Sequence, residues 1–559
     1  MLLVTWVNLV KEMGIMEADY VLTGKIFTAA QKHKYVEAVA VKDGKFVYVG
    51  SKDGAKSYIG PKTEYIVNND GLFIPGMTDS HMHFSSGATE GMYKIQLAGG
   101  KSVDDYTKII KKYVAEHPDR DYYMGTGWEN AIIAERPDKS WIDAACSDKP
   151  VLLQSVDGHS YIVNSKALEN AGIGKGYVSK EKGEFVLDPK TKEPTGLVRE
   201  WAMGDILKTV PDYTVEEIKK AVLWLQDRLL SMGLTSIYEP ILRDETRAQQ
   251  ALEELDIEGK LKLKVVSGFH IRPEHDSPDK LDDFAAIRDA YHGKHYKCNN
   301  LKFVVDGVVE SATAYFFDDY VHKPGYRGNF NCTQEQLNNM MRRAKEKGFQ
   351  VHCHVIGDAA IDAALTGIEY AQAKKPKKDW RPTLTHLQVI RESDIARMAK
   401  DKVIAACDPA WFFKDPIYFD ALEVKYLGLE RASREYKLKS FWDQGVLVSA
   451  ATDFPVTNPD PMETIEVGVT RCAPGDKSEK TVLDPTERVS VEQMLTSYTI
   501  NGAFQNFREK ETGSIEVGKA ADMVLLDQDL FTINPHDIHN TKPIFTMIDG
   551  KMVYSRGKK

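Results

Sequence analysis

Residues 76–84, "GMTDSHMHF", place two histidines, separated by one residue, in a short and largely apolar run. Side chains of a β-strand alternate between its two faces. In a strand, His81 and His83 therefore point the same way, about 7 Å apart along the chain. Either these are structural histidines of a packed core, or they are donors of a functional site. The rest of the sequence has to separate the two interpretations.

Seven further apolar runs follow along the chain, and amphipathic helical stretches such as 214–233 and 333–348 lie between most of them. We expect strands at residues 76–84, 234–240, 261–269, 301–307, 349–358, 382–389, 402–411 and 446–455. Alternating strands and helices are typical of a parallel α/β domain. Eight such units predict a TIM-type (β/α)8 barrel at residues 76–509.

The two ends of the chain have a different sequence pattern from the middle. Residues 17–75 are short alternating runs separated by Gly, Asp and Asn, with an Asp-Gly hairpin signal inside "VKDGKFVYVG". Residues 510–559 repeat this pattern, again with Asp-Gly between two runs. We expect the two ends to form one composite β-sandwich.

The interval 85–230, between the first two predicted barrel strands, is too long for a βα connection. It contains strand-like runs of its own, "DYYMGTGW" and "PVLLQSVDGHS". We therefore expect a subdomain inserted within the barrel. Because it follows a barrel strand, it should form a lid over the C-terminal face, where barrel active sites lie.

Bulk composition narrows the class of protein. The formal net charge of −9 argues against a nucleic-acid-binding surface, which needs a basic stripe. The six cysteines are scattered, without a Cys-x-x-Cys pair, and favour reduced thiols and a cytoplasmic location. No run approaches the roughly 18 apolar residues of a spanning helix, so no membrane partner is expected. The expected partner is a small-molecule substrate; a homodimer is left open.

On the fourth predicted strand, "LKFVVDG", alternation puts Lys302, Val304 and Asp306 on one face. An unpaired ammonium group inside a barrel costs several kcal/mol. Lys302 is therefore expected either to pair with Asp306 or to be chemically modified.

Further metal-binding side chains occur near the ends of the first, fifth, sixth and eighth predicted strands: His81 and His83, His352 and His354, His386, and Asp453. The carboxyl ends of parallel barrel strands meet at one mouth, so these groups should converge there. Imidazole and carboxylate ligands suit zinc, or related metals such as iron, manganese or nickel. Jointly they predict a metal site.

The segments "IPGMTDSHMHF", "GHSYIVNSKAL", "TGLVRE", "LKFVVDG", "HVIGDAAID", "THLQVI", "ATDFPV" and "GSIEVGKAADMVLLD" occur in this order along the chain. With them the sequence resembles the amidohydrolase superfamily, in particular the branch called amidohydrolase family 3 or YtcJ-like. The resemblance covers nearly the whole chain after residue 17. It implies a distorted TIM barrel with a composite β-sandwich, and one or two divalent metals, with zinc expected, at the barrel mouth.

The resemblance also implies roles for the ligands. His81 and His83 would bind the more buried metal with Asp453, and His354 and His386 would bind the second.

Lys302 would be the lysine that many members carboxylate with carbon dioxide to bridge both metals. Not all branches use it, so a mononuclear site stays open. His352 is the alternative to His354 and is otherwise expected to contact the substrate.

In the insert, His159 matches a family motif near the substrate pocket and is a candidate catalytic residue. A solvent-facing or capping histidine is the competing interpretation. Aromatic residues would supply a substrate-binding lid, or form the subdomain's own core: Tyr122, Tyr123, Trp128, Tyr161 and Trp201.

The expected activity is metal-assisted hydrolysis of an amide or another non-peptide C–N bond in a small organic molecule. Asp453 would take the proton of the attacking water and pass it to the leaving nitrogen. The alternatives are a metal-dependent deaminase and a non-catalytic amidohydrolase-like scaffold. Deaminases usually carry His-x-x-Glu at the fifth strand, and here Val-Ile-Gly-Asp follows His354. Retention of every candidate ligand argues against the scaffold.

Overall fold

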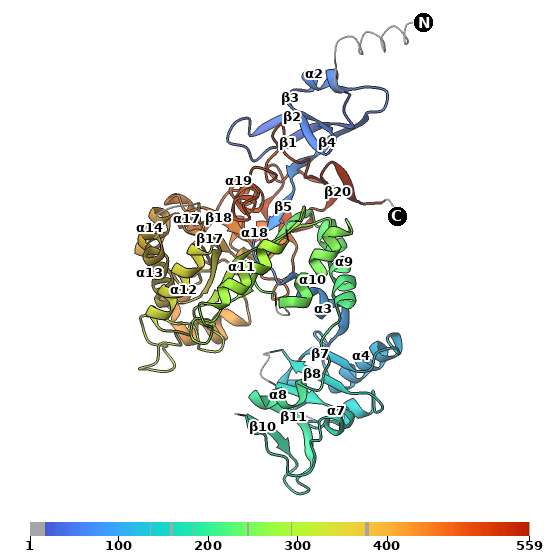
Figure 1. The fold of residues 1–559 in the computed structure, drawn as a ribbon, viewed down its shortest axis with the longest axis vertical. Coiled ribbons are helices and arrows are strands. Elements are labelled where there is room, and N and C mark those ends of the chain that lie inside the picture. The colour runs from blue at the N-terminus through green and yellow to red at the C-terminus, as the bar shows by residue number, and fades with distance from the viewer. Residues whose placement is uncertain are drawn as a thin grey trace. The chain divides into compact units, whose positions relative to one another are not determined.

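The computed structural model describes residues 17–134, 136–156, 160–181, 183–242, 245–291, 293–374 and 379–557. The chain forms two compact units. One consists of Met1–Ser85 and Leu223–Lys559, and the other is Ser86–Val222 (Figure 1).

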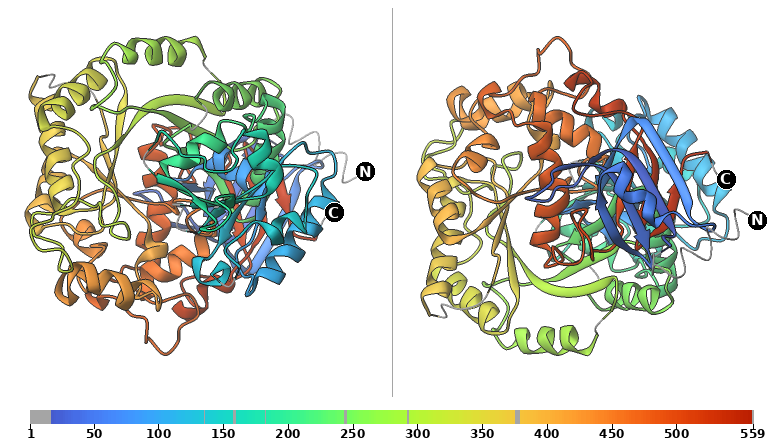
Figure 2. Two further views of the ribbon diagram at one scale, coloured as in Figure 1. Left: turned by 90° about the horizontal axis from the view of Figure 1, so that it is seen from below. Right: turned by 90° about the horizontal axis from the view of Figure 1, so that it is seen from above.

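The larger unit is built on a parallel eight-stranded sheet in the order β18-β17-β16-β15-β14-β13-β12-β5. Its strands are β5 (Met77–Asp79), β12 (Leu234–Glu239), β13 (Lys264–His270), β14 (Tyr296–Val304), β15 (Gln350–Val355), β16 (Thr383–His386), β17 (Ile404–Cys407) and β18 (Val448–Ala450). All eight occur in the predicted order, which confirms the α/β barrel. Figure 2 shows the helices coloured from light green to orange around the outside of this sheet.

Burial on both faces explains why these segments are strands of a parallel sheet. Every residue of β12, β16 and β17 is buried, as expected where helices cover one face and the barrel interior the other. The helices carry one apolar face each. Helix α12 (Gln334–Glu346) begins with a capping box formed by Thr333 and Gln336, and it packs against α13 (Asp358–Lys374).

The first strand is shorter than predicted. β5 ends at Asp79, and the chain then turns before helix α3 (Phe84–Tyr93) begins. The turn forms because the Asp79 carboxylate accepts the backbone N–H of His81, at 3.0 Å. His81 and His83 therefore lie in a loop and are not aligned by strand alternation. Their ring centroids are nevertheless 5.6 Å apart.

Backbone hydrogen bonds join the two edge strands of the barrel beyond their carboxyl ends. The Ser80 N–H donates to the Ala450 carbonyl at 3.0 Å, and the Asp453 N–H donates to the His81 carbonyl at 2.9 Å. The His83 N–H donates to the carbonyl of Phe454 at 2.7 Å. The loops after β5 and β18 are thereby held side by side.

A seven-stranded sheet in the order β21-β20-β19-β4-β1-β2-β3 combines both ends of the chain. Its strands are β1 (Tyr20–Phe27), β2 (Tyr35–Lys42), β3 (Lys45–Gly50), β4 (Glu64–Pro75), β19 (Met523–Leu526), β20 (Pro543–Ile548) and β21 (Lys551–Ser555). β4 pairs in parallel with β1 and antiparallel with β19.

Both Asp-Gly pairs form the expected hairpin turns. Asp43 and Gly44 have φ values of 47° and 79°, and Asp549 and Gly550 have 48° and 70°. Two successive left-handed residues define the turn whose twist matches the flanking strands.

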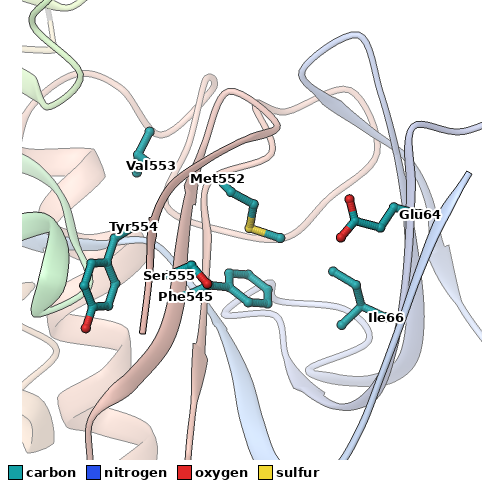
Figure 3. Close-up of a pocket in the computed structure, with 7 residues that line it drawn as sticks. All are labelled: Glu64, Ile66, Phe545, Met552, Val553, Tyr554 and Ser555. Atoms are coloured by element: carbon teal, nitrogen blue, oxygen red, sulfur yellow. The ribbon is translucent and has the colours of Figure 1, made fainter. Parts of the chain in front are cut away.

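A pocket in this sheet is lined by strand residues (Figure 3): Glu64, Ile66, Phe545, Met552, Val553, Tyr554 and Ser555. None of the candidate metal ligands lines it.

The smaller unit contains a six-stranded sheet in the order β10-β11-β9-β8-β7-β6. Its strands are β6 (Lys94–Gln96), β7 (Tyr123–Trp128), β8 (Val151–Ser155), β9 (Ser160–Val163), β10 (Gly183–Leu187) and β11 (Pro194–Glu200). The unit lies within the interval 85–230 that was expected to be an insert. The predicted domain limits and the role as a lid stay predictions.

No helix among the described residues is both long enough and apolar enough to cross a membrane.

A buried ion pair connects the barrel to the mixed sheet. The Lys264 ammonium, on β13, pairs with Asp522, and both side chains are fully buried. It also lies 3.0 Å from Asp549 Oδ1, in the turn between β20 and β21. These charges keep the pKa of Lys264 raised despite its burial, so the pair is ionised.

We expect Lys264→Met to destabilise the protein by about 3–5 kcal/mol, because it leaves the Asp522 carboxylate buried without its cation. The measurement is urea unfolding followed by circular dichroism. Lys262→Met, on a half-exposed residue beside the same strand, is the control and should change stability little. Equal stability of the two variants would show that the pair contributes nothing to the fold.

Candidate metal centre

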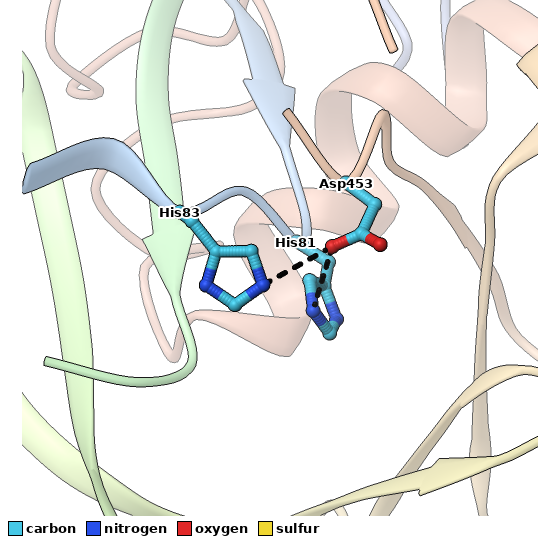
Figure 4. A group of neighbouring side chains, drawn as sticks. All are labelled: His81, His83 and Asp453. Atoms are coloured by element: carbon cyan, nitrogen blue, oxygen red, sulfur yellow. Dashed lines mark ion pairs between the residues drawn. The ribbon is translucent and has the colours of Figure 1, made fainter. Parts of the chain in front are cut away.

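His81, His83 and Asp453 form a compact cluster at the carboxyl end of the barrel (Figure 4). Asp453 Oδ1 lies 3.4 Å from His81 Nε2 and 3.3 Å from His83 Nε2. One ligand atom from each of the three lies within 4.8 Å of the other two. The group can therefore offer two imidazole nitrogens and a carboxylate oxygen to one cation.

The backbone of Asp453 is held in the left-handed region, with φ of 51°. Few residues other than glycine adopt this conformation, although aspartate does so more often than most. The hydrogen bond from its N–H to the His81 carbonyl links the aspartate directly to the histidine loop. The strained conformation thus aims the carboxylate at the two rings.

Two of the other predicted residues lie next to His81. His81 Nδ1 is 2.8 Å from His352 Nε2, and the Lys302 ammonium is 3.2 Å from His81 Nε2. Lys302 is buried, and burial lowers its pKa to about 8. The structure thus places both groups at the candidate ligand His81.

The expected alternative, a Lys302–Asp306 ion pair, is absent from the described part of the chain. Asp306 instead accepts the backbone N–H groups of Tyr315, Ile356 and Gly357. Asp306 lies beyond the end of β14, so the alternation that placed it on the face of Lys302 no longer applies.

His354 and His386 form the other part of the site, with ring centroids 4.6 Å apart. His354 Nε2 lies 3.1 Å from the Gly307 carbonyl, and His386 Nδ1 lies 2.9 Å from Asp408 Oδ2. When these nitrogens donate, the other nitrogen of each ring keeps its lone pair for a cation. His386 has φ of 75°, a second left-handed residue at the site.

Burial sets the protonation of the rings. It lowers the pKa of His81, His352 and His354 well below the ordinary value, and that of His386 to about 3. These four imidazoles are therefore neutral near pH 7, which is their metal-binding form.

The carboxyl groups differ from one another. Burial acts to raise the pKa of Asp453, but the adjacent His83 and the nearby His386 and Lys302 outweigh it and lower this pKa. Asp453 is therefore ionised. Burial raises the pKa of Asp408 well above its ordinary value, and the charge of Asp453 adds to this effect. The ionised form of Asp408 thus needs a positive charge at the site.

The residues present fit a divalent cation. Two buried ring nitrogens at the site have no hydrogen-bond partner in the described part of the chain: His83 Nδ1 and His352 Nδ1. Buried polar atoms are rarely left without partners in folded proteins, so these nitrogens fit a bound cation.

Several residues at the site were not predicted. Asp408 follows β17 directly, and Trp411 stacks on His386 with ring centroids 5.4 Å apart. Glu239, at the end of β12, accepts the backbone N–H of Ser85 at 2.8 Å. Their only sequence signal is their position at or just after the end of a barrel strand.

The predicted residues of the insert belong to the smaller unit. His159 lies outside the described residues. Trp128 is fully buried and donates its indole N–H to the Leu153 carbonyl, and Tyr161 is buried in the same unit. This agrees with the interpretation that these aromatic residues form the core of the insert. Trp201 is 73% exposed. Their roles in substrate binding stay predictions.

Tyr122 and Tyr123 also make contacts within this unit. The Tyr122 hydroxyl donates to the Pro211 carbonyl at 3.1 Å, and the Tyr123 hydroxyl donates to the His117 carbonyl at 2.9 Å.

A parallel (β/α)8-type barrel with imidazole and carboxylate groups at the carboxyl ends of its strands is typical of metal-dependent hydrolases. The chain belongs to the amidohydrolase family, whose family model matches residues 69–554. This confirms the resemblance found in the sequence, together with the hydrolase class.

Three relatives span nearly the whole chain. Protein LONG AFTER FAR-RED 3 from Arabidopsis thaliana is 28% identical over 98% of this chain and 93% of its own length. Putative amidohydrolase YtcJ from Bacillus subtilis is 29% identical over 95% of this chain and 98% of its own. N-substituted formamide deformylase from Arthrobacter pascens is 24% identical, over 96% and 98%.

A solved structure has the same fold. The chain is similar to an uncharacterized metal-dependent hydrolase from Pyrococcus furiosus, with 27% identity and a TM-score of 0.74. The match covers 91% of this chain and 99% of that one.

Asp408→Asn should weaken metal binding about 10–100-fold, because the carboxylate that orients His386 and balances the cation is lost. The measurement is metal affinity by competition with a chelating dye. Asp420→Asn, an exposed residue that also follows β17, is the control. Unchanged affinity in Asp408→Asn would remove His386 from the ligand set.

Proposed function

We propose that this protein hydrolyses an amide or related C–N bond of a small organic substrate at the mouth of its barrel. The observation that carries the proposal is the cluster of His81, His83 and an ionised Asp453 at the carboxyl end of the barrel. The name of the N-substituted formamide deformylase, a relative over nearly the whole chain, supports an N-acyl bond as the bond that is cleaved.

His81, His83 and Asp453 would hold one divalent cation, and His354 and His386 a second. Neutral imidazole with carboxylate is a donor set that zinc prefers, so zinc is the proposed ion. When bound, the metal would polarise the substrate carbonyl and lower the pKa of a water molecule toward about 7.

Asp453 is the proposed proton carrier. Its ionised carboxylate accepts a proton from the attacking water, whose oxygen forms a bond to the carbonyl carbon. The C–N bond then breaks, and Asp453 gives the proton to the leaving nitrogen, so that a carboxylic acid and an amine result. The buried position of Asp453, next to two imidazoles, supports this role.

Lys302 is the proposed site of carboxylation. Its amine lies beside His81, on the inward face of β14, where it has no carboxylate partner among the described ion pairs. The Lys302 ammonium first gives up one proton; addition of carbon dioxide to the neutral amine then forms an N–C bond and releases a second proton. It turns a cationic side chain into an anionic one, which is compatible with a site that gathers cations.

Asp453→Asn should lower kcat by about 10²–10⁴, because the amide keeps one ligating oxygen but cannot accept the proton of water. Turnover on an N-formyl amine and bound metal, by elemental analysis, are measured together. Asp443→Asn, exposed shortly before β18, is the control. Wild-type protein with well under one metal equivalent and no gain of activity on adding zinc would refute the proposed function. Metal loss in step with activity would make Asp453 a ligand only.

Lys302→Ala should lose activity chiefly through loss of metal, with little change in unfolding temperature. Propionate, which can replace the carbamate oxygens, should restore part of the activity. Lys297→Ala, on a half-exposed residue of the same strand, serves as the control. Full metal content and near-normal turnover in Lys302→Ala would rule out a carboxylated ligand.

A further inference from the structure

Two glutamates share one amide donor close to the candidate metal ligand His386. Gln388, two residues after His386, donates its side-chain N–H to Glu435 Oε1 at 2.8 Å and to Glu423 Oε1 at 3.4 Å. Glu423 ends the short π-helix η4 (Phe419–Glu423), and Glu435 follows helix α16 (Leu429–Ala432). Both therefore belong to the long connection between β17 and α17 (Lys439–Asp443), at the carboxyl end of the barrel.

Among the described residues, no ion pair balances these carboxyl groups; the Arg471 guanidinium reaches only the backbone carbonyl of Glu435, at 3.2 Å. Neither Glu423 nor Glu435 takes part in an ion pair within the described part of the chain. Glu435 is fully buried, and its Oε2 has no hydrogen-bond partner among the described residues. Burial, together with their mutual repulsion, raises the pKa of Glu435 well above its ordinary value. Burial and nearby Glu310 raise the pKa of Glu423 to about 7. A pair of this kind is costly unless a proton or a cationic ligand offsets the charge.

Aromatic rings connect this pair to the metal centre. Trp411 stacks on His386, and Tyr436 meets Trp411 edge-on, with ring centroids 6.5 Å apart. The backbone N–H of Tyr436 donates to the Gln388 carbonyl at 2.9 Å. Trp411 and Tyr436 thus form a chain of ring contacts from His386 to the residue that directly follows Glu435.

We propose that Glu423, Glu435 and Gln388 form a cation subsite that selects substrates with an ammonium or guanidinium group near the scissile C–N bond. This inference rests on the proposed function and names the class of its substrate. A guanidinium or ammonium group would donate to the free Glu435 oxygen and to Glu423 in charge-assisted hydrogen bonds. Trp411, which is half-buried and stacks one face on His386, would contribute its other face to attract the organic cation. The subsite would reject a neutral substrate of the same shape, because its buried carboxyl groups would stay unbalanced.

The test is isothermal titration calorimetry on the full-length, zinc-loaded protein, with n-butylguanidinium and its neutral isostere n-butylurea as probes. We expect the cation to bind and the urea to bind at least about tenfold more weakly. Glu423→Gln, at a half-buried position, should weaken binding of the cation about tenfold or more and leave the urea unaffected. Glu430→Gln is the control, because Glu430 lies on α16 with an 81% exposed side chain.

Equal affinity for n-butylguanidinium and n-butylurea, or unchanged affinity for n-butylguanidinium in Glu423→Gln, would contradict the proposal of a cation subsite. The glutamates would then be a structural pair that shares a proton. Tighter binding of Ca²⁺ than of n-butylguanidinium, lost in Glu423→Gln, would also overturn it in favour of a metal site. Should Glu423→Gln fail to keep its zinc and circular dichroism spectrum, Glu435→Gln gives the same comparison at the other carboxyl group of the subsite. Binding needs no turnover, so cation binding without hydrolysis would contradict the proposed function alone.

Discussion

The backbone hydrogen bonds between the loops after β5 and β18 are the constraint on which the site depends. Parallel strands at the two edges of an open sheet would leave unpaired N–H and C=O groups, and here the loops pair instead. The hydrogen bond from Asp453 to the His81 carbonyl closes the barrel and also sets the distance between two candidate ligands. The same hydrogen bonds that close the barrel therefore also bring the candidate ligands together.

This arrangement has a structural cost at the barrel mouth. His386 and Asp453 adopt left-handed backbone conformations, and Asp79 and Glu239 are buried carboxyl groups whose pKa burial raises to about 7. Each of these features destabilises a fold by itself. They are kept where hydrogen bonds from the backbone hold them, as at Asp79, and their concentration at one end of the barrel is typical of functional sites.

The strands could be predicted because each is buried on both faces and therefore appears in the sequence as a short apolar run. The residues at which the strands end could not be predicted. β5 stops at Asp79 because a side chain, not a change in apolar pattern, turns the chain. The donors at the mouth could be predicted as a set, since the carboxyl ends of parallel strands meet. Alternation puts His352 and His354 on one face, and only the structure shows that one contacts His81 and the other His386. Asp408 could not be predicted, because a single carboxylate after a strand is too weak a sequence signal to identify a site residue.

The segments that carry the family resemblance contain two kinds of residue. Some are candidate ligands, and others hold loops, as Asp306 does by accepting three backbone N–H groups from the connections after β14 and β15. Both kinds preserve the barrel mouth and its chemistry. Glu423 and Glu435 lie outside those segments, in the connection between β17 and α17. Selectivity is therefore expected to reside in connections of this kind, where family membership alone does not determine the substrate.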